Sequence, residues 1–277
     1  MVQIQPPQPN FEIYVIVIPS LFFYSFPFLN IRPYGFFLLL GLSLFSYFFV
    51  SRGKSRLNIN TASLFDVVLI GLLSAIIGGR LFYLLEISSA LFSTTNSFDV
   101  QSGGLSIIGA LIVVPIFLYF YSWVKRISFL RLLDEICLYA PILDIFGRLG
   151  CLFAGCCYGA LQESSWSIMY CSDNFLAPQN VQLLPIQFLF AVAFFVVLGI
   201  LQGVGVMLER SGKYNSGIIS GIYFFSAAAI RFVLDFWRGD RLPSWYLGIT
   251  GYQFLSLGIL VISGIFFSYR LYSKQKI

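Results

Sequence analysis

Seven long apolar runs, separated by short polar segments, restrict what this chain can fold into. A helix of about 20 apolar residues spans the roughly 30 Å hydrocarbon core of a bilayer. With 58% hydrophobic and only 10% charged residues, the composition lies outside that of soluble domains. We therefore predict an all-α integral membrane protein with seven transmembrane helices. The runs lie at 34–50, 64–85, 105–122, 136–154, 184–207, 216–236 and 250–269.

The run at 136–154 is the least regular of the seven. It contains Pro141, Asp144, Arg148 and two glycines. Proline removes a helical hydrogen bond, and charges are costly in hydrocarbon. We expect this helix to be interrupted or shortened, and broken helices at membrane depth usually line a cavity.

Basic residues cluster after alternate runs, as a single orientation in the membrane requires. Lysine and arginine in short loops are retained on the cytoplasmic side. We therefore expect a cytoplasmic C-terminus and a periplasmic N-terminus. The net charge of +5 follows from this topology and does not indicate a nucleic-acid partner. The basic residues are Arg52, Lys54, Arg56, Lys125, Arg126, Arg131, Arg210, Lys213, Arg270, Lys274 and Lys276.

The polar parts of the chain suggest two accessory regions. Residues 1–31 lack the basic start of a signal peptide and combine β-branched, aromatic and proline residues, which favours an interfacial strand or arm on the periplasmic side. The segment from about 160 to 183 lacks long apolar runs and is expected to form a small periplasmic cap. The remainder, 32–277, is interpreted as one seven-span membrane domain.

Six further arginines do not follow the topological pattern and need another explanation. A guanidinium within the membrane usually faces a protein interior or a polar cavity. Helical pairing is one explanation, because Asp144 precedes Arg148 and Asp235 follows Arg231 by four residues. The alternative is phosphate binding, which suits the fork geometry of arginine. The six are Arg32, Arg80, Arg148, Arg231, Arg238 and Arg241.

Arg148 lies in an unusual stretch, 147–159, which holds four glycines and three cysteines. Glycines allow the backbone to come close to a bound group. We predict a polar site here in which Arg148 and Arg231 bind the phosphate of a lipid, the abundant anion at that depth.

A series of short motifs extends this prediction over most of the chain, from about 32 to 256. In this order the motifs resemble those of the prolipoprotein diacylglyceryl transferases. They are Pro33-Tyr34-Gly35, Gly78-Gly79-Arg80, Gly103-Gly104-Leu105-Ser106, the stretch Gly147–Gly159, Pro185 with Gln187, Arg231-Phe232 with Asp235 and Arg238, and Gln253 with Ser256.

The resemblance implies a bacterial inner-membrane enzyme that moves diacylglyceryl from phosphatidylglycerol to the lipobox cysteine of a prolipoprotein. We expect a monomer in contact with membrane lipids, with no cofactor and no metal. It also implies site residues. The expected catalytic residues are Arg148, Arg231 and Tyr34, and the expected substrate-binding residues are Arg80, Gly103, Gly104, Ser106, Gly147, Cys151, Gly159, Gln187, Asp235 and Arg238.

The chain departs from the family pattern at the residue that would activate the thiol. The third-span motif of the family continues to a histidine, whereas this chain has Ile108 there and contains no histidine. The remaining candidates for a base are Tyr34, Asp144, Asp235 and a cysteine thiolate. Nearby arginines could instead lower the pKa of the substrate thiol. Two alternatives follow: a phospholipid-binding protein without catalysis, and a transferase with a different acceptor.

Cysteines replace polar residues in the same stretch, at 151 and 156, and Cys157 adjoins them. Three interpretations remain open. The thiols could bind a soft metal ion, Cys171 could form a disulfide with Cys156 or Cys157, or all could serve as small apolar packing residues.

Overall fold

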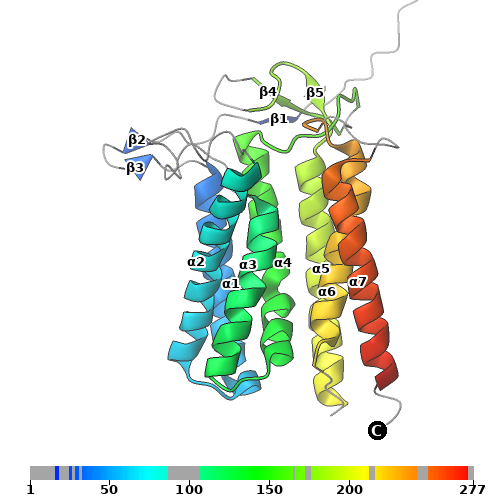
Figure 1. Ribbon diagram of the computed structural model, residues 1–277. Helices are drawn as coiled ribbons and strands as arrows, with labels where there is room; N and C mark the ends of the chain where they lie inside the picture. Colours follow the sequence, from blue (N-terminus) through cyan, green and yellow to red (C-terminus); the bar gives the residue numbers. More distant parts are fainter. Residues whose placement is uncertain are drawn as a thin grey trace, which may run out of the picture. The chain divides into compact units, whose positions relative to one another are not determined.

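The described part of the chain in the computed structural model is mostly helical, with seven α-helices, which Figure 1 labels. Six are long and apolar enough to cross a membrane, and α3, with 18 residues, lies within the workable range of about 17–25. The predicted all-α membrane fold is confirmed. The helices are α1 (Pro33–Leu57), α2 (Thr61–Glu86), α3 (Ile107–Val124), α4 (Phe129–Ala154), α5 (Ile186–Arg210), α6 (Ile218–Leu234) and α7 (Gly251–Ser273). The structure describes residues 16–18, 25–26, 29–30, 33–86, 106–164, 166–171, 176–211, 216–241 and 249–273.

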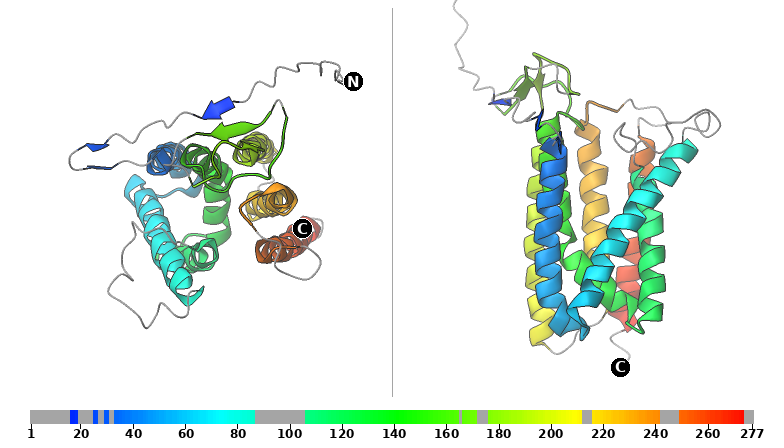
Figure 2. Two further views of the ribbon diagram at one scale, coloured as in Figure 1. Left: turned by 90° about the horizontal axis from the view of Figure 1, so that it is seen from above. Right: turned by 90° about the vertical axis from the view of Figure 1, so that its left-hand side faces the viewer.

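Short strands accompany the helices. Strand β1 (Ile16–Ile18) lies parallel to β4 (Ile168–Tyr170), which pairs antiparallel with β5 (Gln182–Leu183), and Figure 2 shows β1 beside β4. A separate pair joins β2 (Ser25–Phe26) to β3 (Leu29–Asn30). The expected strand in the N-terminal segment is therefore present at 16–18, while its place at a membrane interface stays a prediction.

The chain divides into two compact units, each made of three separate stretches. The first unit contains the strands and the ends of the helices that adjoin them. The second unit contains α2 and α3. The first unit comprises residues 1–41, 142–197 and 224–262, and the second comprises 42–141, 198–223 and 263–277.

Helices α2 and α3 of the second unit pack backbone to backbone. A Cβ on Gly109 would lie 2.0 Å from the carbonyl oxygen of Gly78, and a Cβ on Gly78 would lie 2.7 Å from the carbonyl oxygen of Gly109 and 2.6 Å from the Cβ of Val113. Small residues at such a crossing let two membrane helices gain dispersion contacts that larger residues would prevent.

We expect Gly109→Ala to destabilise the protein by about 1–3 kcal/mol, the usual cost of overpacking. The measurement is the unfolding midpoint in detergent. Gly71→Ala is the matched control on α2, because a Cβ there meets no atom within 4 Å and alanine is the better helix former. Equal stability of the two variants would contradict the close crossing.

Buried charges in the second unit are paired. Asp134, fully buried, accepts hydrogen bonds from the backbone N–H groups of Gly217 and Ser220, at 2.6 and 2.8 Å. It therefore satisfies N–H groups that the first turn of α6 leaves without helical partners. Arg56 contacts Glu135 at 3.3 Å. These charges have a structural role.

The expectation of an interrupted fourth helix is wrong. Helix α4 runs without a break through 26 residues, with Pro141 inside it. A proline removes one backbone donor, and in membranes neighbouring side chains commonly restore the lost hydrogen bonding. Here the amide of Gln202 on α5 donates to the carbonyl oxygen of Leu138, at 2.9 Å, within the turn that precedes Pro141.

Candidate functional site

The last turns of α4 place Arg148 in the first unit, close to the start of α1. Its guanidinium lies over the ring of Phe190, 4.0 Å from the ring centre. Gly150 allows the approach of α1, because a Cβ on it would lie 3.1 Å from the ring of Tyr34. The Tyr34 hydroxyl lies near enough to Arg148, and to the thiols at and after the end of α4, to interact with them electrostatically.

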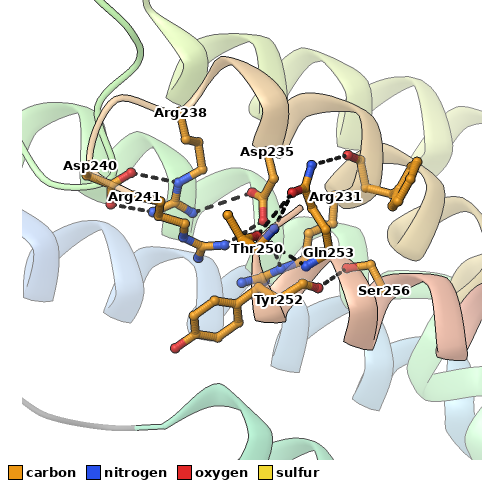
Figure 3. Close-up of polar contacts among 10 residues, drawn as sticks. Arg231, Asp235, Arg238, Asp240, Arg241, Thr250, Tyr252, Gln253 and Ser256 are labelled. Carbon is orange, nitrogen blue, oxygen red and sulfur yellow. Dashed lines mark hydrogen bonds and ion pairs between the residues drawn. The ribbon is translucent and has the colours of Figure 1, made fainter. Parts of the chain in front are cut away.

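A second group of charges lies where α6 ends (Figure 3). Asp235, 3% exposed, begins the short 3-10 helix η2 (Asp235–Trp237). Arg241 donates to its carboxylate at 2.5 Å, and Arg238 lies 3.7 Å from it. Arg238 also makes a bidentate pair with Asp240, at 2.8 and 2.6 Å. Arg241 lies over the ring of Tyr252. Two arginines are thus held tightly by two carboxylates.

The other two arginines are less constrained. Arg231 lies 4.0 Å from Asp235, beyond hydrogen-bonding distance. Arg148 has no carboxylate within 4.0 Å among the residues that the structure describes. The charge of Arg148 also acts on Arg231. We call Arg148, Arg231, Arg238 and Arg241 the arginine cluster.

Among the residues that the structure describes, only two carboxylates face the four guanidinium groups, so the cluster keeps a surplus of two positive charges. That surplus rests on Arg148 and Arg231, which are therefore able to bind an anion.

Two glycines position the segment that carries Arg238. A Cβ on Gly239 would lie 2.4 Å from the carbonyl oxygen of Gly159, and a Cβ on Gly159 would lie 2.3 Å from that of Leu184. The N–H of Gly239 donates to the carbonyl oxygen of Tyr158, at 3.0 Å. Backbone contacts therefore fix Arg238 next to the end of α4.

Three thiols gather beside the arginines. The sulfur atoms of Cys151, Cys156 and Cys157, here called the cysteine cluster, lie within 4.8 Å of one another. Hydrogen bonds from Cys151 and Cys156 lower the pKa of the Cys157 thiol, and Arg238 and Arg148 add to the effect. All five cysteines are free thiols, so the structure contains no disulfide from Cys171.

The segment at 160–183 forms a small cap with its own apolar core. Ile168, Tyr170, Ala177 and Leu183 are buried in it. The hydroxyl of Tyr170 donates to the carbonyl oxygen of Leu152, at 2.8 Å, and burial raises the pKa of this tyrosine. The cap is therefore anchored on the end of α4. Its place on the periplasmic side stays a prediction.

The sequence as a whole identifies the family. A model of the prolipoprotein diacylglyceryl transferases matches residues 21–269. The chain belongs to this family. A phosphatidylglycerol–prolipoprotein diacylglyceryl transferase 2 of Clostridium perfringens is 33% identical over 235 residues, covering 84% of this chain and 88% of that protein. The transferase of Clostridium tetani is 28% identical over 247 residues, covering 89% and 96%.

Most of the residues that the resemblance to the transferases singled out lie in the first unit. Gly147 is among them, although a Cβ there would meet no atom within 4 Å. Arg80 and Ser106 belong to the second unit, where Arg80 lies over the ring of Tyr83. Gly103 and Gly104 lie outside the described residues. Those in the first unit are Tyr34, Gly147, Arg148, Cys151, Gly159, Gln187, Arg231, Asp235 and Arg238. Their roles in the transferase reaction stay predictions.

The sequence did not predict that Arg241 pairs with Asp235. Arg238 is only 8% exposed, and Arg241 contacts Asp235 directly. The alternation of acidic and basic residues from 235 to 241 was the available signal. The six-residue separation of Arg241 from Asp235 fits no helical pairing, so a pattern search does not find it.

Proposed function

We propose that this chain transfers the diacylglyceryl group of phosphatidylglycerol to the cysteine thiol of a prolipoprotein. Membership of the family supports the reaction, since the relatives above are named for it. The observation that carries the proposal is the surplus positive charge on Arg148 and Arg231. A lipid phosphate is the group that this pair of guanidinium side chains is suited to bind.

The reaction then requires stabilisation of a leaving phosphate. The thiolate sulfur of the acceptor forms a bond to the terminal glyceryl carbon of the lipid. The bond between that carbon and the phosphate oxygen breaks, and glycerol phosphate leaves with the electron pair. Arg148 and Arg231 stabilise the charge that develops on the phosphate. The proton of the thiol is released to the aqueous side.

Activation of the thiol is electrostatic in this proposal. The chain contains no histidine, and Ile108 stands where the family motif has one. A thiol with an ordinary pKa near 8.5 ionises more readily beside cations. The arginine cluster supplies them, and the hydroxyl of Tyr34, which feels the charge of Arg148, would orient the substrate.

The remaining features of the proposal concern the setting of the enzyme. The chain is a multi-pass membrane protein, and we propose an inner-membrane location with a periplasmic N-terminus and a cytoplasmic C-terminus. The alternating basic segments support this orientation. Residues 1–31 would then be a periplasmic arm and 160–183 a periplasmic cap. We propose that the protein acts as a monomer.

The test is transfer of labelled diacylglyceryl from phosphatidylglycerol to a lipobox peptide by the purified protein. We expect the peptide to gain the mass of one diacylglyceryl group, attached through sulfur. Retained binding of phosphatidylglycerol without any transfer would contradict the enzyme proposal and favour a phospholipid-binding protein. Transfer to a different thiol, with none to the lipobox peptide, would favour an altered acceptor.

A further inference from the structure

The cysteine cluster is built by the way in which α4 ends. Gly155, with φ +70°, ends the helix in the left-handed region. The N–H of Cys156 donates to the carbonyl oxygen of Cys151 at 3.1 Å, and the N–H of Gly155 donates to that of Leu152 at 3.4 Å. These two hydrogen bonds define a Schellman motif, which brings the fourth-last residue of α4 against the second residue after the helix. Both of those positions are cysteine.

Cys157 adds the third thiol at a conformational cost. Its φ is +56°, a left-handed conformation that costs a residue with a side chain roughly 1–2 kcal/mol. Such outliers persist where the surroundings hold them and are often functional. Here the amide of Gln187 donates to the carbonyl oxygen of Cys156 at 2.9 Å, which fixes the turn from the side of α5. The three sulfur atoms therefore converge on a constrained backbone.

The spacing of the sulfur atoms suits an ion better than a disulfide. Three thiolates bound to one ion at about 2.3 Å lie about 4 Å apart, so sulfur atoms within 4.8 Å of one another need to move by less than about 1 Å. A disulfide requires a separation of about 2.05 Å and would leave the third thiol unused.

The donor set restricts the identity of the ion. All three donors are sulfur, and the chain contains no histidine to complete a mixed set. Soft thiolate donors select soft ions, whereas structural zinc sites take four protein ligands. The ligating group found among the described residues has three members. A three-coordinate sulfur site is therefore best matched to Cu(I).

The charge of such a site would be compensated locally. One Cu(I) ion bound by three thiolates carries two negative charges, and binding releases the three thiol protons to water. Arg148 acts electrostatically on Cys151 and Cys157, and Arg238 acts on Cys157. These two guanidinium groups supply positive charge that would offset the two negative charges of the metal-bound site.

We propose that Cys151, Cys156 and Cys157 form a binding site for one Cu(I) ion at the end of α4. The site goes beyond the proposed transferase function, and its test does not depend on transferase activity.

The experiment is an anaerobic titration of the reduced, metal-free protein in detergent with Cu(I), in competition with a chromogenic Cu(I) chelator. We expect one equivalent to bind, with the ultraviolet absorption of copper–thiolate bonds. Loss of a direct ligand should weaken binding by at least about 100-fold, the upper end of the effect of losing an outer-shell partner. We expect this for Cys151→Ser and for Cys157→Ser.

Two other cysteines provide matched controls. Cys137 is buried and Cys171 is exposed, and neither belongs to the cluster. Cys137→Ser and Cys171→Ser should bind Cu(I) as the wild type does. The melting temperature of each variant in detergent identifies any that fails to fold. In folded variants, Cu(I) binding that survives replacement of all three cluster cysteines would overturn the proposal. So would binding that depends on Cys171, or binding of Zn(II) with no binding of Cu(I).

Discussion

Arg148→Ala is expected to reduce diacylglyceryl transfer by about 100- to 1,000-fold, the usual effect of removing one group that stabilises developing negative charge. Arg148 is not paired with a carboxylate within 4.0 Å in the described part of the chain. Removing it therefore leaves no buried carboxylate without a partner. The loss should appear in the transfer rate and in phosphatidylglycerol binding, with little change in stability. The measurement combines the peptide assay with a binding isotherm for labelled lipid.

Arg131→Ala is the matched control for this variant. Arg131 lies on the same helix as Arg148 and is exposed, so its loss removes an equal charge from a place outside the site. Arg148→Lys should recover part of the activity, because a lysine supplies the charge without the bidentate geometry. If Arg148→Ala binds and transfers lipid as the wild type does, the phosphate assignment is wrong.

Asp235→Ala should have the largest effect on stability. The carboxylate is fully buried and lies against Arg231, Arg238 and Arg241. Breaking a buried ion pair by removing one partner costs about 3–5 kcal/mol, because the remaining charge is left without compensation. We expect a lower unfolding midpoint in detergent and a loss of transferase activity, since the arginine cluster can no longer hold its arrangement.

A double variant tests whether Asp235→Ala destabilises the protein through repulsion among the arginines or through a general folding defect. Arg241→Gln removes the guanidinium that donates to Asp235 at 2.5 Å. Combined with Asp235→Ala, it should recover part of the lost stability, because fewer like charges then face one another. Additive losses in the double variant would show that the two residues are not coupled. Asp66→Ala provides a control carboxylate in the second unit, where Asp66 accepts a hydrogen bond from Tyr121.

The sequence predicts the helices well because few backbone structures can cross a bilayer. Each long apolar run must satisfy its own backbone hydrogen bonds, so helix number and position follow from the length of the runs. Pro141 misled the prediction for α4, because a side chain on another helix, Gln202, hydrogen-bonds in the turn before it. Such compensation depends on packing between distant segments and has no local signature.

The sequence predicts which residues belong to the site better than it predicts which of them contact one another. Arg148 and Arg231 stood out as basic residues within apolar runs, because their cost in a membrane demands a reason. Which arginines are neutralised could not be predicted, since Asp235 is shared among residues four, three and six positions away. The convergence of three thiols depends on the left-handed residues Gly155 and Cys157, and only the first of these has a recognisable sequence signal.

The crossing of Gly159 and Gly239 has a consequence for how this protein can change over evolution. The joint is made of carbonyl and amide groups, so it tolerates the exchange of neighbouring side chains as long as both glycines remain. Substitutions at 151, 156 or 157 would therefore leave the backbone contacts that position Arg238 in place. Proteins that keep both glycines can therefore differ in the side chains of the site while the backbone around it stays the same.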